Sequence, residues 1–173
     1  MKILETQRLI LREMDSAIDA EFVFELLNSE GFIKYIGDRG VRSLDDARDF
    51  IETRYRQSYR DHGYGLYTVE LKENGKQVGI CGFVRRDSLP GPDIGFAFLP
   101  QHEGNGYGYE SGSAVMEYGS EKLDFDEVLA ITTLDNTPSM KLLEKLGFSL
   151  LRVTDTPQGE RLNLFSSRPV QEV

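Results

Sequence analysis

Residues 101–108, Gln-His-Glu-Gly-Asn-Gly-Tyr-Gly, have the composition of a loop that binds an anion through its backbone. Gly104, Gly106 and Gly108 remove side chains from the chain just before a segment whose apolar residues have helical spacing. The first N–H groups of a helix have no partner inside the helix, and the helix dipole favours negative charge there. The loop therefore predicts a phosphate-binding site, with a solvent-exposed turn as the alternative.

Two common nucleotide-binding motifs do not match this loop. A Walker P-loop ends in Gly-Lys-Ser/Thr, which is absent here, and a dinucleotide fingerprint needs a third glycine where the chain has Tyr109. The pattern that does match is Gln-x-x-Gly-x-Gly, which resembles the acyl-CoA pyrophosphate loop of the GCN5-related N-acetyltransferases. The resemblance implies a cofactor-binding set in this loop of Gln101, Gly104, Asn105, Gly106, Tyr107 and Gly108.

Residues 135–148 carry a second motif, Asn-x-x-Ser-x-x-Leu-x-x-x-x-Gly-Phe. Thr137 is predicted to cap a helix that ends before Gly147, which suits the left-handed position after a helix. The motif is similar to the segment that follows the fifth strand in the same acetyltransferase family. The resemblance implies that Asn136 binds the pantetheine arm and that Ser139 lies near the thioester. The alternative is a short capped helix of the core.

A third segment, residues 5–12, reads Glu-Thr-Gln-Arg-Leu-Ile-Leu-Arg and looks like the first strand of the RimJ/RimL-type branch. That branch includes acetyltransferases of ribosomal-protein N-termini. The three segments stand in family order, so the chain is identified as a member of this superfamily. The resemblance implies a single domain over residues 1–173 with an α/β (α+β) fold. Its sheet would be twisted and mainly antiparallel, with about 6–7 strands and about four helices on both faces.

The spacing of apolar residues and turn signals places the elements that position these motifs. Strands are predicted over residues 7–13, 66–72, 77–85, 93–99 and 128–134, with one more hairpin within 149–166. Helices are predicted to begin near Ser16, Ser43 and Thr137, and after the glycine loop. The aromatic-rich segment 31–38 has no such pattern. It forms either one wall of the acceptor pocket, with Phe32 and Tyr35 facing the substrate, or a loop packed by its own aromatic residues.

The resemblance implies acetyl transfer from acetyl-CoA to a primary amine, on a protein N-terminus or a small molecule, in a ternary complex. The backbone of Phe96, Ala97 and Phe98 would bind the thioester oxygen, because negative charge develops there during attack. Many family members place a tyrosine acid seven residues after the asparagine, where this chain has Leu143, which the resemblance also assigns to the cofactor-binding set. Ser139 is the candidate substitute, and a CoA thiolate is also able to leave without an acid.

A base must remove a proton from the attacking amine. Asp93 is the candidate by its position on the fourth family strand, and Glu30, Glu110 or a bound water are the alternatives. Because a peptide α-amine has a pKa near 8, it needs less help from a base than a lysine side chain does. The lack of an evident base therefore favours an α-amine or another weakly basic amine.

The composition excludes several other classes of protein. The 173 residues include one cysteine and two histidines, which predicts no disulfide and no histidine-based metal site. The net charge of −9 argues against nucleic acid and favours approach of a cationic substrate. No apolar run suits a membrane span or a signal peptide, so a cytoplasmic location is expected. The oligomeric state is expected to be a monomer or a homodimer. Cys81 is predicted to be a buried apolar residue, with a catalytic thiol as the alternative.

Two other functions remain open at this point. A non-catalytic acyl-CoA-binding regulatory protein is suggested by Leu143 in place of the usual tyrosine. A nucleotide-binding module that uses the glycine loop differently is the other. Turnover of acetyl-CoA would distinguish an acetyltransferase from the regulatory protein. Selective binding of CoA over NAD and ATP would distinguish it from the nucleotide-binding module.

Overall fold

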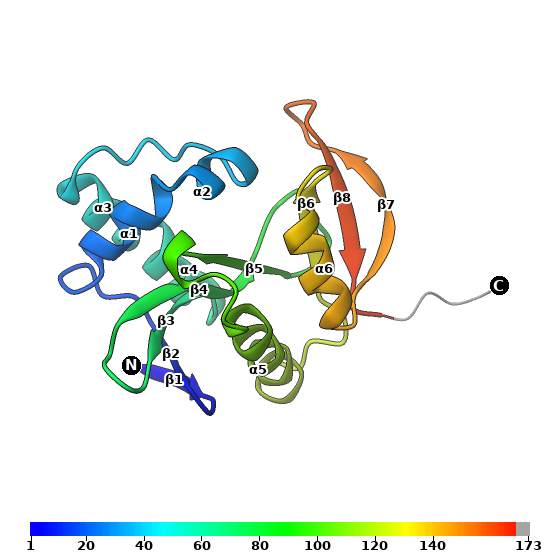
Figure 1. Cartoon of the computed structure of the whole chain (residues 1–173). Helices are drawn as coiled ribbons and strands as arrows, with labels where there is room; N and C mark the ends of the chain where they lie inside the picture. The colour runs from blue at the N-terminus through cyan, green and yellow to red at the C-terminus, as the bar shows by residue number, and fades with distance from the viewer. Residues whose placement is uncertain (169–173) are drawn as a thin grey trace.

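The computed structural model describes residues 1–168, and residues 169–173 of the expected domain lie outside this described part. Its centre is one eight-stranded sheet with the order β1-β2-β3-β4-β5-β6-β8-β7 (Figure 1). The strands are β1 (Lys2–Glu5), β2 (Leu9–Arg12), β3 (Leu66–Leu71), β4 (Gln77–Val84), β5 (Asp93–Phe98), β6 (Leu129–Thr133), β7 (Ser149–Asp155) and β8 (Arg161–Ser166). All neighbouring pairs except β5 and β6 are antiparallel, which confirms the predicted mixed sheet.

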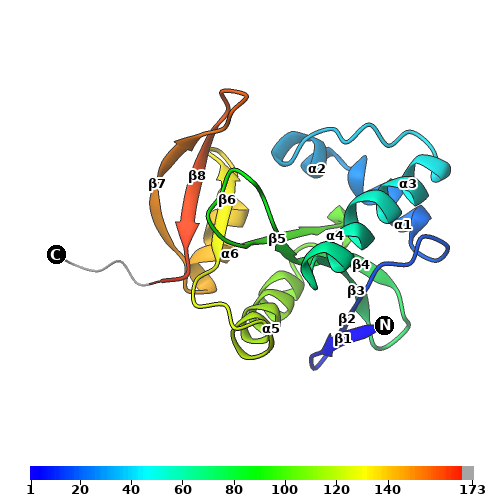
Figure 2. The same ribbon diagram turned by 180° about the vertical axis from the view of Figure 1, so that it is seen from behind.

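The helices lie on both faces of this sheet, as predicted (Figures 1 and 2). They are α1 (Ala20–Leu27), α2 (Glu30–Tyr35), α3 (Leu44–Phe50), α4 (Arg56–His62), α5 (Tyr107–Lys122) and α6 (Thr137–Lys145). A π-helical segment, Ile51–Tyr55, joins α3 and α4 into one continuous helical run. A short 3-10 turn, Pro100–His102, precedes the glycine loop.

Two elements, β1 and α2, go beyond the prediction and raise the strand count above 6–7. The strand β1 has four residues with exposed ends and is held by pairing with β2, from Lys2↔Arg12 to Glu5↔Ile10. The helix α2 has six residues, of which Phe32 alone is buried. An element this short has no apolar stripe to detect in the sequence, because its stability comes from tertiary packing rather than from its own periodicity.

Two hydrophobic clusters fill the two faces of the sheet. The cluster under α5 and α6 includes Tyr67, Phe83, Val115, Leu143 and Phe165. The cluster under α1, α3 and the π-helical segment includes Leu26, Ala47, Ile51, Ile80 and Leu99. Cys81 lies in the first cluster with no solvent exposure, and burial raises its pKa far above the usual range of a thiol. Cys81 is therefore the buried apolar residue that was predicted.

The sheet opens between β5 and β6. The strands β4 and β5 are paired at six successive positions, from Gly79↔Phe98 to Val84↔Asp93. The parallel pair β5 and β6 meets at one position, Asp93↔Leu129. Beyond this point the two strands diverge. Within residues 1–168, the residues of β5 after Asp93 pair with β4 on one side and with no strand on the other. Backbone groups along that edge are free to bind something other than a strand.

Candidate active site

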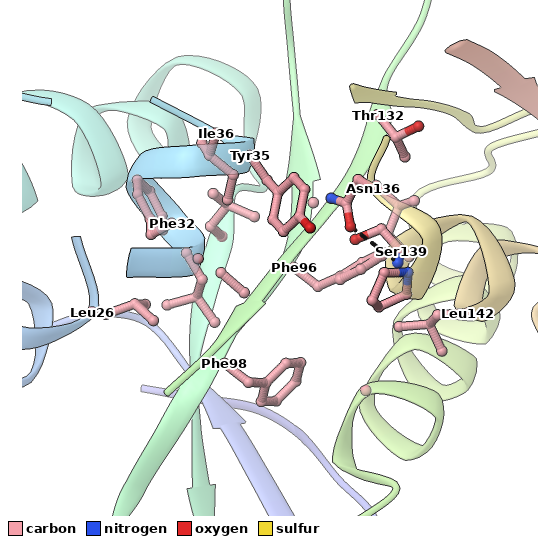
Figure 3. A pocket seen from close by; sticks show the side chains of 18 of the residues that line it. Leu26, Phe32, Tyr35, Ile36, Phe96, Phe98, Thr132, Asn136, Ser139 and Leu142 are labelled. Atoms are coloured by element: carbon pink, nitrogen blue, oxygen red, sulfur yellow. Dashed lines mark hydrogen bonds between the residues drawn. The ribbon is translucent and has the colours of Figure 1, made fainter. Parts of the chain in front are cut away.

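A cavity of about 930 Å³ occupies the opening between β5 and β6. Figure 3 shows its walls: Phe32 and Tyr35 from α2 on one side, Phe96 from β5 across the middle, and Asn136 and Ser139 from the start of α6 on the other. The hydroxyl group of Tyr35 points from α2 toward Asn136 (Figure 3). Segments more than 100 residues apart in the chain therefore meet around one space.

Most of the residues predicted from the sequence line this cavity. They are Phe32, Tyr35, Asp93, Phe96, Ala97, Phe98, Gly104, Gly106, Tyr107, Gly108, Asn136, Ser139 and Leu143. Gln101 and Asn105 do not line it, because their amides are engaged elsewhere. The Gln101 Nε2 donates to Glu25 Oε1 at 2.9 Å, and the Asn105 Nδ2 donates to the His102 carbonyl oxygen at 3.1 Å.

The glycine loop ends as an uncapped helix N-terminus. Gly106 occupies the N-cap position of the 16-residue helix α5 with φ of 81°, and no side chain of residues 1–168 caps the helix. Gly104 also has a positive φ, 80°. Only glycine adopts this backbone conformation without strain, and the two turns bring a bare N-terminus to the cavity wall. The first turn of α5 thus supplies free backbone donors and the positive end of the helix dipole.

Glu110, in the first turns of α5, ties the helix to the corner between β1 and β2. Its carboxylate accepts from the Thr6 hydroxyl, from the Arg8 backbone N–H at 2.9 Å and from the Arg8 Nε at 2.7 Å. The Arg8 guanidinium also lies 4.7 Å from the ring centroid of Tyr107. Burial acts to raise the pKa of Glu110, but these hydrogen bonds outweigh it and hold the pKa below its usual range. We call this contact set, Thr6, Arg8 and Glu110, the helix clamp.

Replacing Glu110 with glutamine should destabilise the protein by about 1–2 kcal/mol at pH 7, because charge-assisted hydrogen bonds are lost. The folded state lowers the pKa of Glu110, so the unfolded chain binds the proton more readily. The stabilisation is therefore complete above the ordinary value of 4.5 and is lost as the pH falls below it. Urea unfolding across pH 3–7 should show this acid-dependent difference between wild type and variant.

The matched control for this prediction is Glu117→Gln, an exposed residue of the same helix that forms no hydrogen bond or ion pair within residues 1–168. We expect its unfolding free energy to follow that of the wild type at every pH. Equal losses in the two variants would show that the helix clamp does not stabilise the start of α5.

The start of α6 forms an amide and hydroxyl corner at the cavity. The N-cap residue is Asn136, not Thr137 as the sequence predicted, and the Asn136 Oδ1 accepts from the Ser139 N–H at 3.3 Å (Figure 3). Both residue types are good caps; Asn136 takes the role because its backbone lies outside the helix while Thr137 is already its first residue. Within residues 1–168, the Asn136 Nδ2 and the Ser139 Oγ form no hydrogen bond, so both can serve a ligand.

Leu143 takes the position at which many family members carry a tyrosine. Its side chain is 1% exposed and belongs to the hydrophobic cluster under α5 and α6. An aliphatic side chain has no proton to give, so any acid in this cavity must come from another residue. Ser139 and Tyr35 are among the residues with hydroxyl protons that line the same space.

Asp93 lies where β5 and β6 begin to diverge. Its side chain is 1% exposed, and both carboxylate oxygens lie 3.2 Å from the Arg86 Nε. Burial raises the pKa of Asp93 to about 6, although the charge and hydrogen bonds of Arg86 oppose the shift. A carboxylate with this pKa is ionised at neutral pH and still able to accept a proton, as a general base requires.

His102 is a cavity residue that the sequence analysis did not select. Its Nε2 is buried and has no hydrogen-bond partner within residues 1–168, and the side chain lines the cavity beside the glycine loop. Burial lowers the pKa of His102, which favours the neutral form of the ring. Buried polar groups are rarely left without a partner, which points to a ligand contact here. In the sequence, the only signal for a role of His102 is its position inside the Gln-x-x-Gly-x-Gly motif.

This combination of a backbone anion site, a free strand edge and an amide–hydroxyl corner suits an enzyme that holds a phosphorylated, peptide-like donor. The chain belongs to the acetyltransferase (GNAT) domain family, whose family model matches residues 8–149. It is 31% identical over 147 residues to the uncharacterized N-acetyltransferase YoaA of Bacillus subtilis (strain 168), covering 84% of this chain and 82% of that protein. The chain is thus an acetyltransferase enzyme, which leaves the non-catalytic alternative without support.

Solved structures agree with this fold. An acetyltransferase of the GNAT family from Bacillus anthracis has a TM-score of 0.78 and 24% identity, over 96% of this chain and 97% of that one. RimL, a ribosomal L7/L12 α-N-protein acetyltransferase solved in complex with coenzyme A, has a TM-score of 0.82 and 16% identity, over 96% and 97% of the two chains. At these identities the likeness establishes the shared fold, not a shared acceptor.

The described residues include neither a metal-binding cluster nor a membrane-spanning helix. Residues 1–168 contain no cluster of three or more His, Cys, Asp or Glu side chains able to hold a metal ion. None of the helices in that part of the chain combines the length and the apolar character needed to cross a membrane.

Proposed function

We propose that the protein transfers an acetyl group from acetyl-CoA to a primary amine, by direct attack of the amine on the thioester, as a member of the RimJ/RimL-like branch. The observation that carries this proposal is the single cavity that joins the uncapped N-terminus of α5, the free edge of β5 and the corner at Asn136 and Ser139. The coenzyme A bound to RimL, a neighbour with this fold, supports the same donor here.

The donor would lie along these three features in order. The pyrophosphate would accept from backbone N–H groups at Gly104 to Gly108, where the helix dipole favours negative charge. The pantetheine arm, which has amide groups like a peptide, would pair with the free backbone of β5 and with the Asn136 amide. The thioester would then lie near Ser139.

The chemical step needs one bond made and one broken. The amine nitrogen attacks the thioester carbon, and the carbonyl oxygen gains a negative charge that backbone N–H groups at Phe96 to Phe98 would stabilise. The C–S bond then breaks and CoA leaves as a thiolate, which Ser139 would stabilise by donating a hydrogen bond. The proton from the amine would pass to Asp93. Since Asp93 precedes Phe96 by three residues of extended strand, about 10 Å, a water molecule would carry the proton between them.

A ligand melt followed by a turnover assay tests this function. Acetyl-CoA at 100 times its Kd should raise the unfolding free energy by about 2.7 kcal/mol and the Tm by several degrees, while NAD and ATP should not. A primary amine should then trigger thiol release, and the N,N-dimethylated form of the same amine, which cannot form a stable amide, should not. Equal shifts with ATP or NAD, or no thiol release with any primary amine, would contradict the proposal.

Three further features stay predictions. They are a single domain over residues 1–173, a cytoplasmic location, and a monomeric or homodimeric state.

A further inference from the structure

The side of the cavity formed by α2, the end of α3 and the π-helical segment carries an excess of positive charge. We call this side the acceptor wall; its apolar part is Phe32, Tyr35, Phe50 and Tyr55. The charged residues that line the cavity are Glu30, Lys34, Arg39, Arg54, Arg86, Asp93 and Glu103, and Glu103 lies on the glycine loop rather than on this wall. The four cations outnumber the three anions, although the whole chain has 29 acidic and 20 basic residues.

Two of these cations have carboxylates close by. Arg86 pairs with Asp93 at 3.2 Å. The pKa of Lys34 is raised, first by the Tyr35 hydroxyl and further by the carboxylates of Asp135 and Glu30. Arg39 and Arg54, by contrast, form no ion pair within residues 1–168. The acceptor wall therefore presents two guanidinium groups whose charge the described chain does not balance.

The arginines near these two in the chain differ from them in their pairing. Between residues 36 and 60 the chain has six arginines, of which four lie outside the cavity lining. Each of these four pairs with a carboxylate: Arg42 with Asp38, Arg48 with Asp45, and both Arg56 and Arg60 with Glu52. Of the six, the two that line the cavity, Arg39 and Arg54, are the two that form no ion pair within residues 1–168.

Arg54 packs against an aromatic pair, and the charge of Arg39 acts on the phenol of that pair. The Arg54 guanidinium lies 5.9 Å from the Phe50 ring centroid, and the Tyr55 ring packs edge-on against Phe50 at 5.2 Å. Arg39 and Tyr55 both line the cavity, and the charge of Arg39 acts against the burial that raises the pKa of Tyr55. Arg54 and Tyr55 also belong to the π-helical segment, a distortion frequent at functional sites.

We propose that Arg39 and Arg54 form an anion-binding subsite on the acceptor wall, so that the acceptor is a primary amine that also carries a carboxylate. A guanidinium group is planar and offers paired N–H donors that match a carboxylate. The inference rests on the proposed acetyl transfer, because it names the substrate class of that site. It also reverses the expectation from the net charge of −9, since the local charge at the acceptor wall opposes a cationic substrate.

The carboxylate has two possible sources, a free amino acid and an acidic residue near the N-terminus of a peptide. Turnover with three small acceptors of equal length tests the shared chemistry: an amino carboxylate, its amide and the corresponding diamine. We expect kcat/KM for the amino carboxylate to exceed that for the amide by about 10-fold or more, the effect of one charge-assisted pair. Turnover of peptides that begin Ala-Glu or Ala-Lys then distinguishes the two sources, because only the Ala-Glu peptide has an acidic residue next to its N-terminus.

Arg39→Gln, Arg54→Gln and the double variant should each lower the ratio of kcat/KM for amino carboxylate over amide, and the double variant should bring it to about one. The matched control is Arg152→Gln on β7, an exposed arginine outside the cavity that also forms no ion pair within residues 1–168. Its ratio should equal that of the wild type. A wild-type ratio of one, or a preference for the diamine, would overturn the subsite and leave acetyl transfer intact.

A binding measurement keeps the subsite testable without turnover. The N-acetylated amino carboxylate, titrated by calorimetry in the presence of CoA, should bind the double variant at least about 10-fold more weakly than the wild type. Absence of turnover with every acceptor would count against the proposed function alone. Equal binding of this compound to wild type and double variant would count against the subsite alone.

Discussion

Asp93→Asn should lower kcat/KM for acetyl transfer by about 100-fold or more at pH 8, the size of effect expected for a lost general base. The substitution keeps the shape of the side chain and removes its ability to take a proton. It should fold, because the charge of Asp93 is costly where it lies and Arg86, whose side chain is 37% exposed, can be hydrated in its absence. Steady-state kinetics with a saturating donor and a weakly basic amine measure the loss.

The pH profile distinguishes a base from a structural residue. The amine itself must be neutral to attack, so kcat/KM falls with slope one below the amine pKa, near 8 for an α-amine. Below pH 6 the wild type should fall with slope two, since burial raises the pKa of Asp93 to about 6 and its carboxylate is then protonated too. The Asp93→Asn variant should keep slope one throughout.

The matched control is Asp19→Asn, which removes the charge of another buried aspartate that does not line the cavity. Asp19 has no solvent exposure and accepts from both terminal nitrogens of Arg12 at 2.8 Å. This variant should lose stability and, assayed below its Tm, keep a kcat/KM near the wild-type value. A second slope below pH 6 that persists in Asp93→Asn would assign the base to another group, such as Glu30.

The raised pKa of Asp93 also affects the stability of the folded protein, with the opposite dependence on pH to that of Glu110. The folded protein binds a proton at Asp93 more readily than the unfolded chain does, so between about pH 4 and 6 stability falls as the pH rises. The helix clamp at Glu110 is instead lost as the pH falls below 4.5. The two carboxylates therefore change the stability of the protein in opposite directions as the pH falls.

The strands and the glycine loop could be predicted from the sequence because their signals are local. Alternation marks β5, Asn74-Gly75 marks the turn between β3 and β4, and the three glycines mark the start of α5. The N-cap of α6 was placed one residue late, because Asn136 and Thr137 are chemically equivalent signals. The difference between them lies in the backbone angles, which neighbouring segments decide.

The features that the sequence did not reveal all depend on contacts between distant segments. The pairing of Glu110 with Thr6 and Arg8 spans about 100 positions of the chain. The lack of an ion pair at Arg39 and Arg54 within residues 1–168 can be seen only in the structure, which shows the carboxylate partner of each neighbouring arginine. The net charge of the whole chain predicts a cationic substrate, whereas the acceptor wall has an excess of positive charge. The two differ because the net charge also counts residues that lie outside the cavity.

Gly106→Val should weaken acetyl-CoA binding by about 100-fold, since two charge-assisted hydrogen bonds of about 1.5 kcal/mol each would be lost. Gly106 has φ of 81° at the N-cap of α5, and a Cβ there would lie 3.4 Å from the Arg8 Nη2. A β-branched residue strains this backbone and fills the space that a phosphate needs. Calorimetric titration of acetyl-CoA measures the change.

Gly159→Val is the matched control for backbone strain. Gly159 has φ of 83° in the turn between β7 and β8, and a Cβ there would meet nothing within 4 Å. Both variants should therefore lose about 1–2 kcal/mol of stability, but only Gly106→Val should lose affinity for the donor. A truncated donor, acetyl-pantetheine, carries no pyrophosphate, so its KM should be the same in Gly106→Val and in Gly159→Val. Equal weakening of acetyl-CoA and acetyl-pantetheine in Gly106→Val would mean that the loop shapes the whole cavity rather than binding the phosphates.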